Sequence, residues 1–120
     1  MTHADPVTVD VHGDVTVIGF RHDRVQGPEV PGLIERLMTI VESLEAPRLV
    51  ISLAGLEYVP SSFLGLIVVI NRCVTARGGR VRLARVPPKL WQAFTLSRLD
   101  RVFRDYATEQ EAVVSFADDE

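Results

Sequence analysis

The stretch that decides the fold reads Leu49-Val-Ile-Ser-Leu-Ala-Gly-Leu-Glu-Tyr-Val-Pro-Ser-Ser-Phe-Leu-Gly-Leu66. Residues 48–53 form a short, mostly apolar run, which is typical of a strand buried on both faces of a sheet. A turn over residues 54–60 follows, and residues 61–77 return to a helical pattern that Gly78 and Gly79 end. A buried strand, a turn and an apolar helix in this order predict one unit of an α/β sheet.

The alternation of strands and helices continues on both sides of this unit. Toward the N-terminus, apolar and β-branched residues on either side of His12-Gly13-Asp14 predict two strands joined as a hairpin. Apolar residues at helical spacing, followed by Pro47, predict an amphipathic helix. Toward the C-terminus, Thr108 followed by Glu111 has the form of a capping box. The further elements are predicted as strands at residues 7–11, 15–20, 80–84 and 102–107, and helices at residues 33–44, 87–99 and 108–116.

This order of elements predicts an α/β fold in a single domain. Because helices and strands alternate strictly after the hairpin, we expect a mixed, mostly parallel sheet with an N-terminal β-hairpin and four helices packed against it. A chain of 120 residues, 47% of them hydrophobic, is long enough for one core without disulfides or metal. We expect residues 1–6 to be flexible, residues 7–116 to form the domain and residues 117–120 to be an acidic tail.

Composition and charge argue against several classes of function. A formal net charge of −3 gives no overall attraction for phosphates, so we expect no direct nucleic-acid binding. Cys73 is the single cysteine, which fits a reducing compartment. No secretory signal opens the chain, and the longest apolar run, residues 63–70, is far shorter than the roughly 20 residues that cross a bilayer. The sequence therefore predicts a cytoplasmic protein without membrane insertion.

Candidate groups for catalysis or metal binding are few. His3, His12 and His22 fall in a chain end, a turn and a loop, and no acidic residue accompanies them at ligand-like spacing. Gly78-Gly79 lacks the surrounding pattern of a nucleotide-binding loop. No base or acid is placed to activate a serine nucleophile. We therefore expect no enzymatic activity, no catalytic residues, no metal and no cofactor.

The most informative place is the start of the helix predicted at residues 61–77. Ser61 or Ser62 suits the N-cap, and the same position suits a phosphate because the helix end is positive. Between residues 63 and 74 the only strongly polar side chains are Asn71 and Arg72. Either this helix is buried between the sheet and a neighbouring helix, or one side of its first turns is an apolar docking strip for a partner. The candidate partner-binding residues are Tyr58, Pro60, Ser61, Ser62, Phe63, Leu66, Val69 and Arg72.

Nearly the whole chain resembles the STAS domains, and within them the bacterial anti-sigma factor antagonists (anti-anti-sigma factors). The run at residues 58–66, which follows the strand and turn at residues 49–56, resembles the family's aspartate-serine-serine-glycine-leucine-glycine signature. Here Pro60 replaces the aspartate and Phe63 replaces the first glycine. Ser61 falls on the serine that the family's kinase phosphorylates, and Ser62 on the serine after it. The other similar stretches are residues 78–83, 86–103 and 106–112.

The resemblance implies a regulatory module that acts through protein binding. Its partner would be an anti-sigma factor and serine kinase with a histidine-kinase-like ATPase fold, docked on the loop and helix at residues 60–72. Binding would release a sigma factor, and phosphate on Ser61, or less favourably on Ser62, would prevent binding through its charge. The replacements at Pro60 and Phe63 motivate an alternative, a STAS-like subunit of a lipid-transport or other multi-protein complex that is never phosphorylated.

Overall fold

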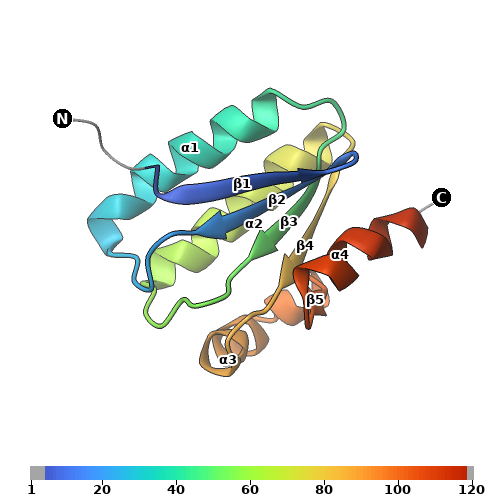
Figure 1. Cartoon of the computed structure of the whole chain (residues 1–120). Coiled ribbons are helices and arrows are strands. Elements are labelled where there is room, and N and C mark those ends of the chain that lie inside the picture. The colour runs from blue at the N-terminus through green and yellow to red at the C-terminus, as the bar shows by residue number, and fades with distance from the viewer. Residues whose placement is uncertain (1–4, 119–120) are drawn as a thin grey trace.

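Within residues 5–118, which the computed structural model describes, five strands form one mixed sheet in the spatial order β1-β2-β3-β4-β5 (Figure 1). β1 pairs antiparallel with β2, and every later neighbour is parallel. The predicted hairpin and the mixed, mostly parallel sheet are therefore confirmed. The strands are β1 (Val7–His12), β2 (Val15–Phe20), β3 (Arg48–Ser52), β4 (Arg80–Ala84) and β5 (Asp105–Tyr106).

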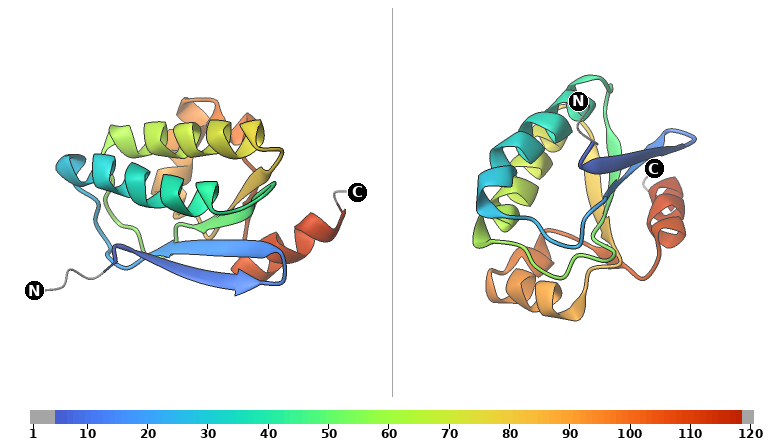
Figure 2. Two further views of the ribbon diagram at one scale, coloured as in Figure 1. Left: turned by 90° about the horizontal axis from the view of Figure 1, so that it is seen from above. Right: turned by 60° about the vertical axis from the view of Figure 1, so that its left-hand side comes forward.

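Four α-helices surround the sheet, as predicted. Figure 2 shows α1 and α2 side by side on one face of the sheet and α4 on the opposite face, while α3 lies beyond the end of β4. Helix α1 begins at Val30, earlier than its periodicity predicts, because Pro31 is well tolerated in a first turn that needs no amide donor. The helices are α1 (Val30–Glu42), α2 (Ser61–Ala76), α3 (Pro88–Leu96) and α4 (Glu109–Ser115).

The sheet separates two hydrophobic layers of unequal size. Leu49, Val50 and Ile51 of β3 are fully buried, which confirms the central position predicted for this strand. The larger layer lies between the sheet and α1 and α2, where it includes Leu37, and it continues to Phe94 of α3. The smaller layer lies under α4 and comprises Val15, Val17, Val50, Ala84, Ala112 and Phe116.

The last strand is much shorter than the predicted 102–107. Helix α3 ends at Leu96, Arg98 adopts a left-handed conformation with φ of 60°, and Leu99–Arg101 form a 3-10 turn. The apolar side chain of Phe103 packs edge-on against Phe94, with ring centroids 6.1 Å apart, instead of continuing a ladder. Phe103 therefore belongs to the core, and only Asp105 and Tyr106 pair with β4.

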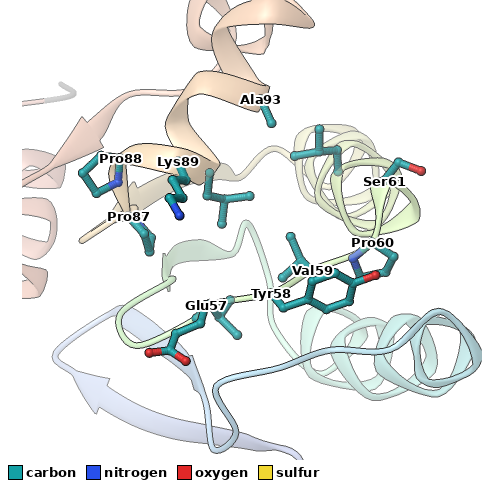
Figure 3. A pocket seen from close by; sticks show the side chains of 12 residues that line it. Glu57, Tyr58, Val59, Pro60, Ser61, Pro87, Pro88, Lys89 and Ala93 are labelled. Atoms are coloured by element: carbon teal, nitrogen blue, oxygen red, sulfur yellow. The ribbon is translucent and has the colours of Figure 1, made fainter.

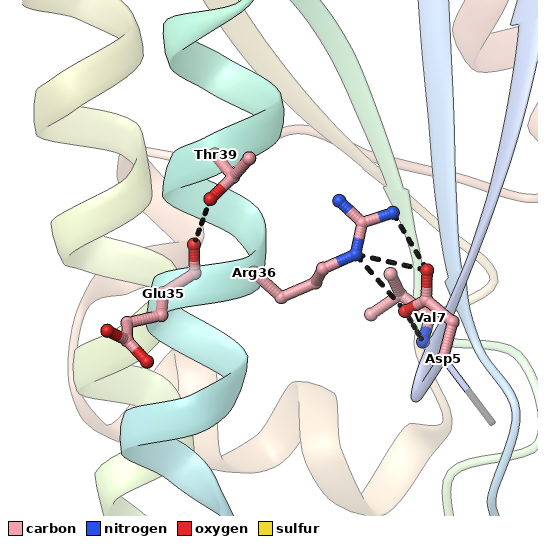
Figure 4. Close-up of polar contacts among 5 residues, drawn as sticks. All are labelled: Asp5, Val7, Glu35, Arg36 and Thr39. Atoms are coloured by element: carbon pink, nitrogen blue, oxygen red, sulfur yellow. Dashed lines mark hydrogen bonds and ion pairs between the residues drawn. The ribbon is translucent and has the colours of Figure 1, made fainter. Parts of the chain in front are cut away.

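Asp5, just before β1, makes polar contacts with both α1 and β1. Figure 4 shows the Asp5 carboxylate accepting hydrogen bonds from Arg36 of α1, the shortest at 2.8 Å, and from the Val7 amide at 3.1 Å. The Arg36 bonds first, and then the Val7 bond, hold the pKa of Asp5 below its usual value. The other residues expected to be flexible, 1–4, lie outside the described residues, as do 119–120 of the acidic tail.

Candidate functional site

The connection from β3 to α2 is held in place by the loop that follows β2. Val25 donates a backbone hydrogen bond to Tyr58 at 2.9 Å, and Glu57 donates one to Asp23 at 2.7 Å. The side chains of Leu53 and Leu56 anchor the same connection because they are buried in the core. Because both of its ends and its middle are fixed, the connection presents the first turn of α2 in a defined position at the carboxyl edge of the sheet.

The start of α2 differs from the predicted arrangement. The N-cap is Pro60, with φ of −77° and ψ of 163°, and it makes no side-chain capping bond. Ser61 and Ser62 are the first two helical residues, and both are exposed. The expectation that a serine is the N-cap is wrong, because the proline already has the extended geometry that the cap requires. The first turn of α2 also carries no acidic side chain, so nothing within that turn offsets its positive end.

Two of the predicted docking residues lie in the core. Phe63 is 0% exposed and its ring meets that of Phe20 at 5.5 Å, and Leu66 is 1% exposed. They belong to the stripe of α2 that faces the sheet, together with Ile67, Ile70 and Val74. Including Phe63 and Leu66 among the partner-contacting residues is therefore wrong: for them the buried interpretation of the helix holds.

The opposite side of α2 remains accessible. Ser61, Ser62, Val69 and Arg72 are exposed, and Val69 keeps 40% of its surface in contact with solvent. Tyr58, just before the helix, is 55% exposed. Together with the half-buried Pro60, these residues form one surface, here called the docking face: Tyr58, Pro60, Ser61, Ser62, Val69 and Arg72.

A groove of about 890 Å³ opens beside the docking face, between α2 and α3 (Figure 3). Its walls are largely apolar, and Glu57 and Lys89 are the charged groups among its lining residues. Ser61 stands on its rim, whereas Ser62 is not part of it. Sequence reasoning missed the contribution of α3, although topology offered a signal: α3 follows the carboxyl end of β4, which lies beside that of β3. The apolar lining includes Tyr58, Val59, Pro60, Leu64, Leu90 and Ala93.

A second polar contact lies on the other face of the sheet. The hydroxyl of the buried Ser52 donates to Glu109 at 2.7 Å, and Arg85 lies 3.8 Å from the same carboxylate. Burial disfavours the charged form of Glu109, but the Ser52 hydrogen bond and the Arg85 charge outweigh it and lower the pKa of this carboxyl. This contact ties the first residue of α4 to the end of β3, which is a structural role.

The remaining candidate groups do not assemble into a chemical site. His12 and His22 are exposed and lie at opposite ends of β2, Cys73 is half-buried, and His3 is outside the described residues. Among residues 5–118, no group of three or more histidine, cysteine, aspartate or glutamate side chains is placed to hold a metal ion. In the same part of the chain, no helix has the length and apolar character needed to span a bilayer.

The comparison with protein families identifies the fold. The model of the STAS domain matches residues 7–112, and the chain therefore belongs to the STAS domain family. The predicted family and fold are thereby confirmed. No curated protein matches the sequence at a significant level.

Solved structures with the same fold are described as anti-sigma factor antagonists. A STAS domain protein of this kind from Planctomyces limnophilus is 26% identical over 92% of this chain and 97% of its own, with a TM-score of 0.85. An antagonist from Mycobacterium paratuberculosis is 21% identical over 91% of each chain, with a TM-score of 0.79. The Bacillus cell fate determinant SpoIIAA, solved in its phosphorylated form, is 22% identical over 92% of this chain and 98% of its own, with a TM-score of 0.71.

Proposed function

We propose that the protein is a cytoplasmic anti-sigma factor antagonist, a protein-binding module and not an enzyme. Its partner is an anti-sigma factor with serine-kinase activity and a histidine-kinase-like ATPase fold, and binding releases the sigma factor that this partner holds. The observation that carries the proposal is the position of Ser61, exposed at the first residue of α2 on the rim of an apolar groove, in a chain of the STAS family.

The docking face has the composition of a protein interface. Tyr58 and Val69 offer exposed apolar surface, and Arg72 offers a charge at the far end of the same side of α2. Tyrosine and arginine are over-represented among residues that dominate binding energy. The groove beside them gives a partner side chain a concave apolar place to enter. This combination supports docking through Tyr58, Pro60, Val69 and Arg72 around the two serines.

Phosphorylation of Ser61 switches off binding of the partner. A phosphoserine adds about −1.5 to −2 charges. In the free protein the positive end of α2, which has no acidic side chain in its first turn, favours that charge. In the complex the phosphate is removed from water on an apolar rim, and that desolvation opposes binding. Ser62 is exposed but lies outside the groove, so it is the weaker candidate for the switch.

The test uses a protein with a histidine-kinase-like ATPase fold from the same organism, such as any that is encoded next to this gene. Calorimetric titration with wild-type protein, Ser61→Ala and Ser61→Asp is expected to show similar affinity for the first two and a loss of about tenfold or more for the third. Ser62→Asp is the matched control and is expected to lose much less. After incubation with ATP, mass spectrometry should place phosphate on Ser61 in the wild type and find none in Ser61→Ala. Equal binding of wild type and Ser61→Asp would show that the switch is wrong.

A further inference from the structure

β1 is an edge strand that exposes apolar side chains. It is the first strand in the sheet order, so among residues 5–118 no strand lies on its outer side (Figure 1). Its last four residues are all exposed, and Val9 and Val11 keep 40% and 70% of their surface in contact with solvent. Native proteins protect such edges with lysine, proline or a covering segment, because free backbone groups can pair with another strand. Residues 7–12 contain neither lysine nor proline.

The hydrogen bonds of the hairpin show which backbone groups of β1 point outward. The amide of Arg21, directly after β2, donates to the carbonyl of Pro6 at 3.1 Å, so Pro6 directs its carbonyl toward β2. Bonding alternates along an antiparallel pair. In the register of this hairpin, residues 8, 10 and 12 therefore also bond toward β2, and residues 7, 9 and 11 direct their amides and carbonyls outward.

Only one of the three outward amides has a partner within the chain. The Val7 amide donates to the Asp5 carboxylate at 3.1 Å, and Arg36 of α1 holds that carboxylate in place (Figure 4). The outward backbone groups of Val9 and Val11 face no strand in the part of the chain that the structure describes. We call these two residues, with their backbone groups and exposed side chains, the open edge.

We propose that the open edge pairs with the open edge of a second copy of this protein, antiparallel and about a two-fold axis. Val9 of each copy lies opposite Val11 of the other, and each such pair exchanges two backbone hydrogen bonds. The exposed valine side chains lie on the same face of the joined sheet, so those of one copy cover those of the other. Val7 keeps its bond to Asp5 and lies opposite Gly13 of the second copy, which has no side chain to displace that carboxylate.

The neighbouring registers satisfy fewer of the free groups. Shifted one way, the second copy needs the Val7 amide, which Asp5 already holds. Shifted the other way, Val9 lies opposite the turn at Gly13, where φ is 64°, and only Val11 pairs. Other proteins could add a strand here, but a second copy matches the open edge in length, in the spacing of its free groups and in its two valines. Because so short a strand buries little area, we expect a weak dimer with a dissociation constant of about 10–100 µM.

Asp10 limits the strength of this pairing. Its side chain lies on the other face of the strand from the two valines, where it lines a polar pocket with His12 and Glu109. In the proposed register it lies directly opposite Asp10 of the second copy, at the two-fold axis. Like charges in this position destabilise a strand pair. The dimer is therefore reversible, and it becomes tighter as salt screens the two carboxylates.

The open edge is separate from the docking face. β1 lies at the margin of the sheet, and β2 stands between it and β3, the strand that leads to Ser61. Ser61→Asp should therefore dimerise like the wild type. Because the measurements below use this protein alone, their outcome does not depend on whether it binds an anti-sigma factor.

The first test is sedimentation velocity of the full chain from about 10 µM to about 1 mM, a range that brackets the expected dissociation constant. Wild-type protein should dimerise reversibly, and Asp10→Thr should tighten the dimer about threefold to tenfold by removing the like charges. Val11→Pro removes an outward amide that makes no bond within one copy, so the monomer should fold while the dimer is lost. Val11→Lys should also prevent dimerisation. Val114→Lys, at a valine of α4 that is 55% exposed, is the matched control and should have no effect.

The second test locates the contact by disulfide formation. In a Cys73→Ser background, Val9→Cys mixed with Val11→Cys should cross-link faster than either protein alone, because only the mixed pair lies directly opposite, within the distance that a disulfide spans. Faster cross-linking of Val11→Cys with itself would contradict the register. A monomeric Asp10→Thr at about 1 mM, or a dimer that Asp10→Thr weakens, would overturn the proposal. Equal losses in Val11→Lys and Val114→Lys would do the same, since they would place the contact elsewhere.

Discussion

Phe63 and Val69 are two apolar residues of α2 with opposite roles. Phe63 is fully buried against Phe20, and Val69 faces solvent on the docking face. In urea unfolding, Phe63→Ala should lower the free energy of unfolding by about 3–5 kcal/mol, because it leaves a cavity in the core. Val69→Ala should change it by less than about 0.5 kcal/mol yet weaken partner binding.

Two results would contradict these assignments. A small loss of stability in Phe63→Ala, together with a large loss of affinity, would mean that Phe63 contacts the partner. Unchanged affinity in Val69→Ala would remove Val69 from it. Calorimetric titration with the anti-sigma factor gives the affinities, and urea unfolding of the same samples gives the stabilities.

The sequence alone could not separate these residues. Apolar side chains occur almost all round α2, so its periodicity does not point to a single buried side. Which side is buried depends on where α1 and the sheet lie, and that is a property of the whole fold. The exposed serines were identifiable from sequence because hydroxyl residues before an apolar run mark a helix start. Lys89 and Leu90 were missed because they join the groove only when α3 docks near α2.

At the scale of an element, the start of α2 has an unusual composition. Pro60 is the N-cap, and no side chain caps the first amides. The resemblance to the STAS signature implies an aspartate at this place. Pro60→Asp and Pro60→Ala lose the same proline rigidity, but only the aspartate can accept from the free amides of the first turn. Pro60→Asp should therefore be about 1 kcal/mol more stable than Pro60→Ala in urea unfolding.

The same pair of variants bears on the phosphorylation site. An aspartate at the cap adds negative charge beside Ser61 and competes for the same amides as a phosphate. Equal stability of Pro60→Asp and Pro60→Ala would mean that these amides are not available to an acidic group. The argument that the helix end favours a phosphate on Ser61 would then fail.

The order of helices and strands along the chain was predictable, because most of them have a clear apolar periodicity or are bounded by proline or glycine. Pro47, Gly78-Gly79 and Pro87-Pro88 mark boundaries that the structure reproduces within a few residues. The capping box is confirmed in part, since the Thr108 hydroxyl accepts from the Glu111 amide at 3.0 Å. The segment before β5 was mispredicted because Val102 and Phe103 look like part of a strand, whereas Phe103 turns into the core and Val102 remains exposed.

At the scale of the whole molecule, the parallel strands place the start of the docking face at one end of the sheet. The docking face begins at the carboxyl end of β3 and follows the exposed side of α2 as far as Arg72. Ala112 of α4 and Phe116, which directly follows this helix, cover part of the opposite face of the sheet. The succession of strands and helices along the chain was predictable from sequence, but the groove between α2 and α3 forms only in the folded chain.

The most direct test of the central claim maps the partner onto the whole chain. Unlabelled anti-sigma factor is added to isotopically labelled protein, and amide signals are followed by nuclear magnetic resonance. The account predicts that signals change for residues 56–62 and along the exposed side of α2 through Val69 and Arg72, while those of α4 stay in place. Changes centred on α4, or no change near Ser61 despite binding, would contradict it.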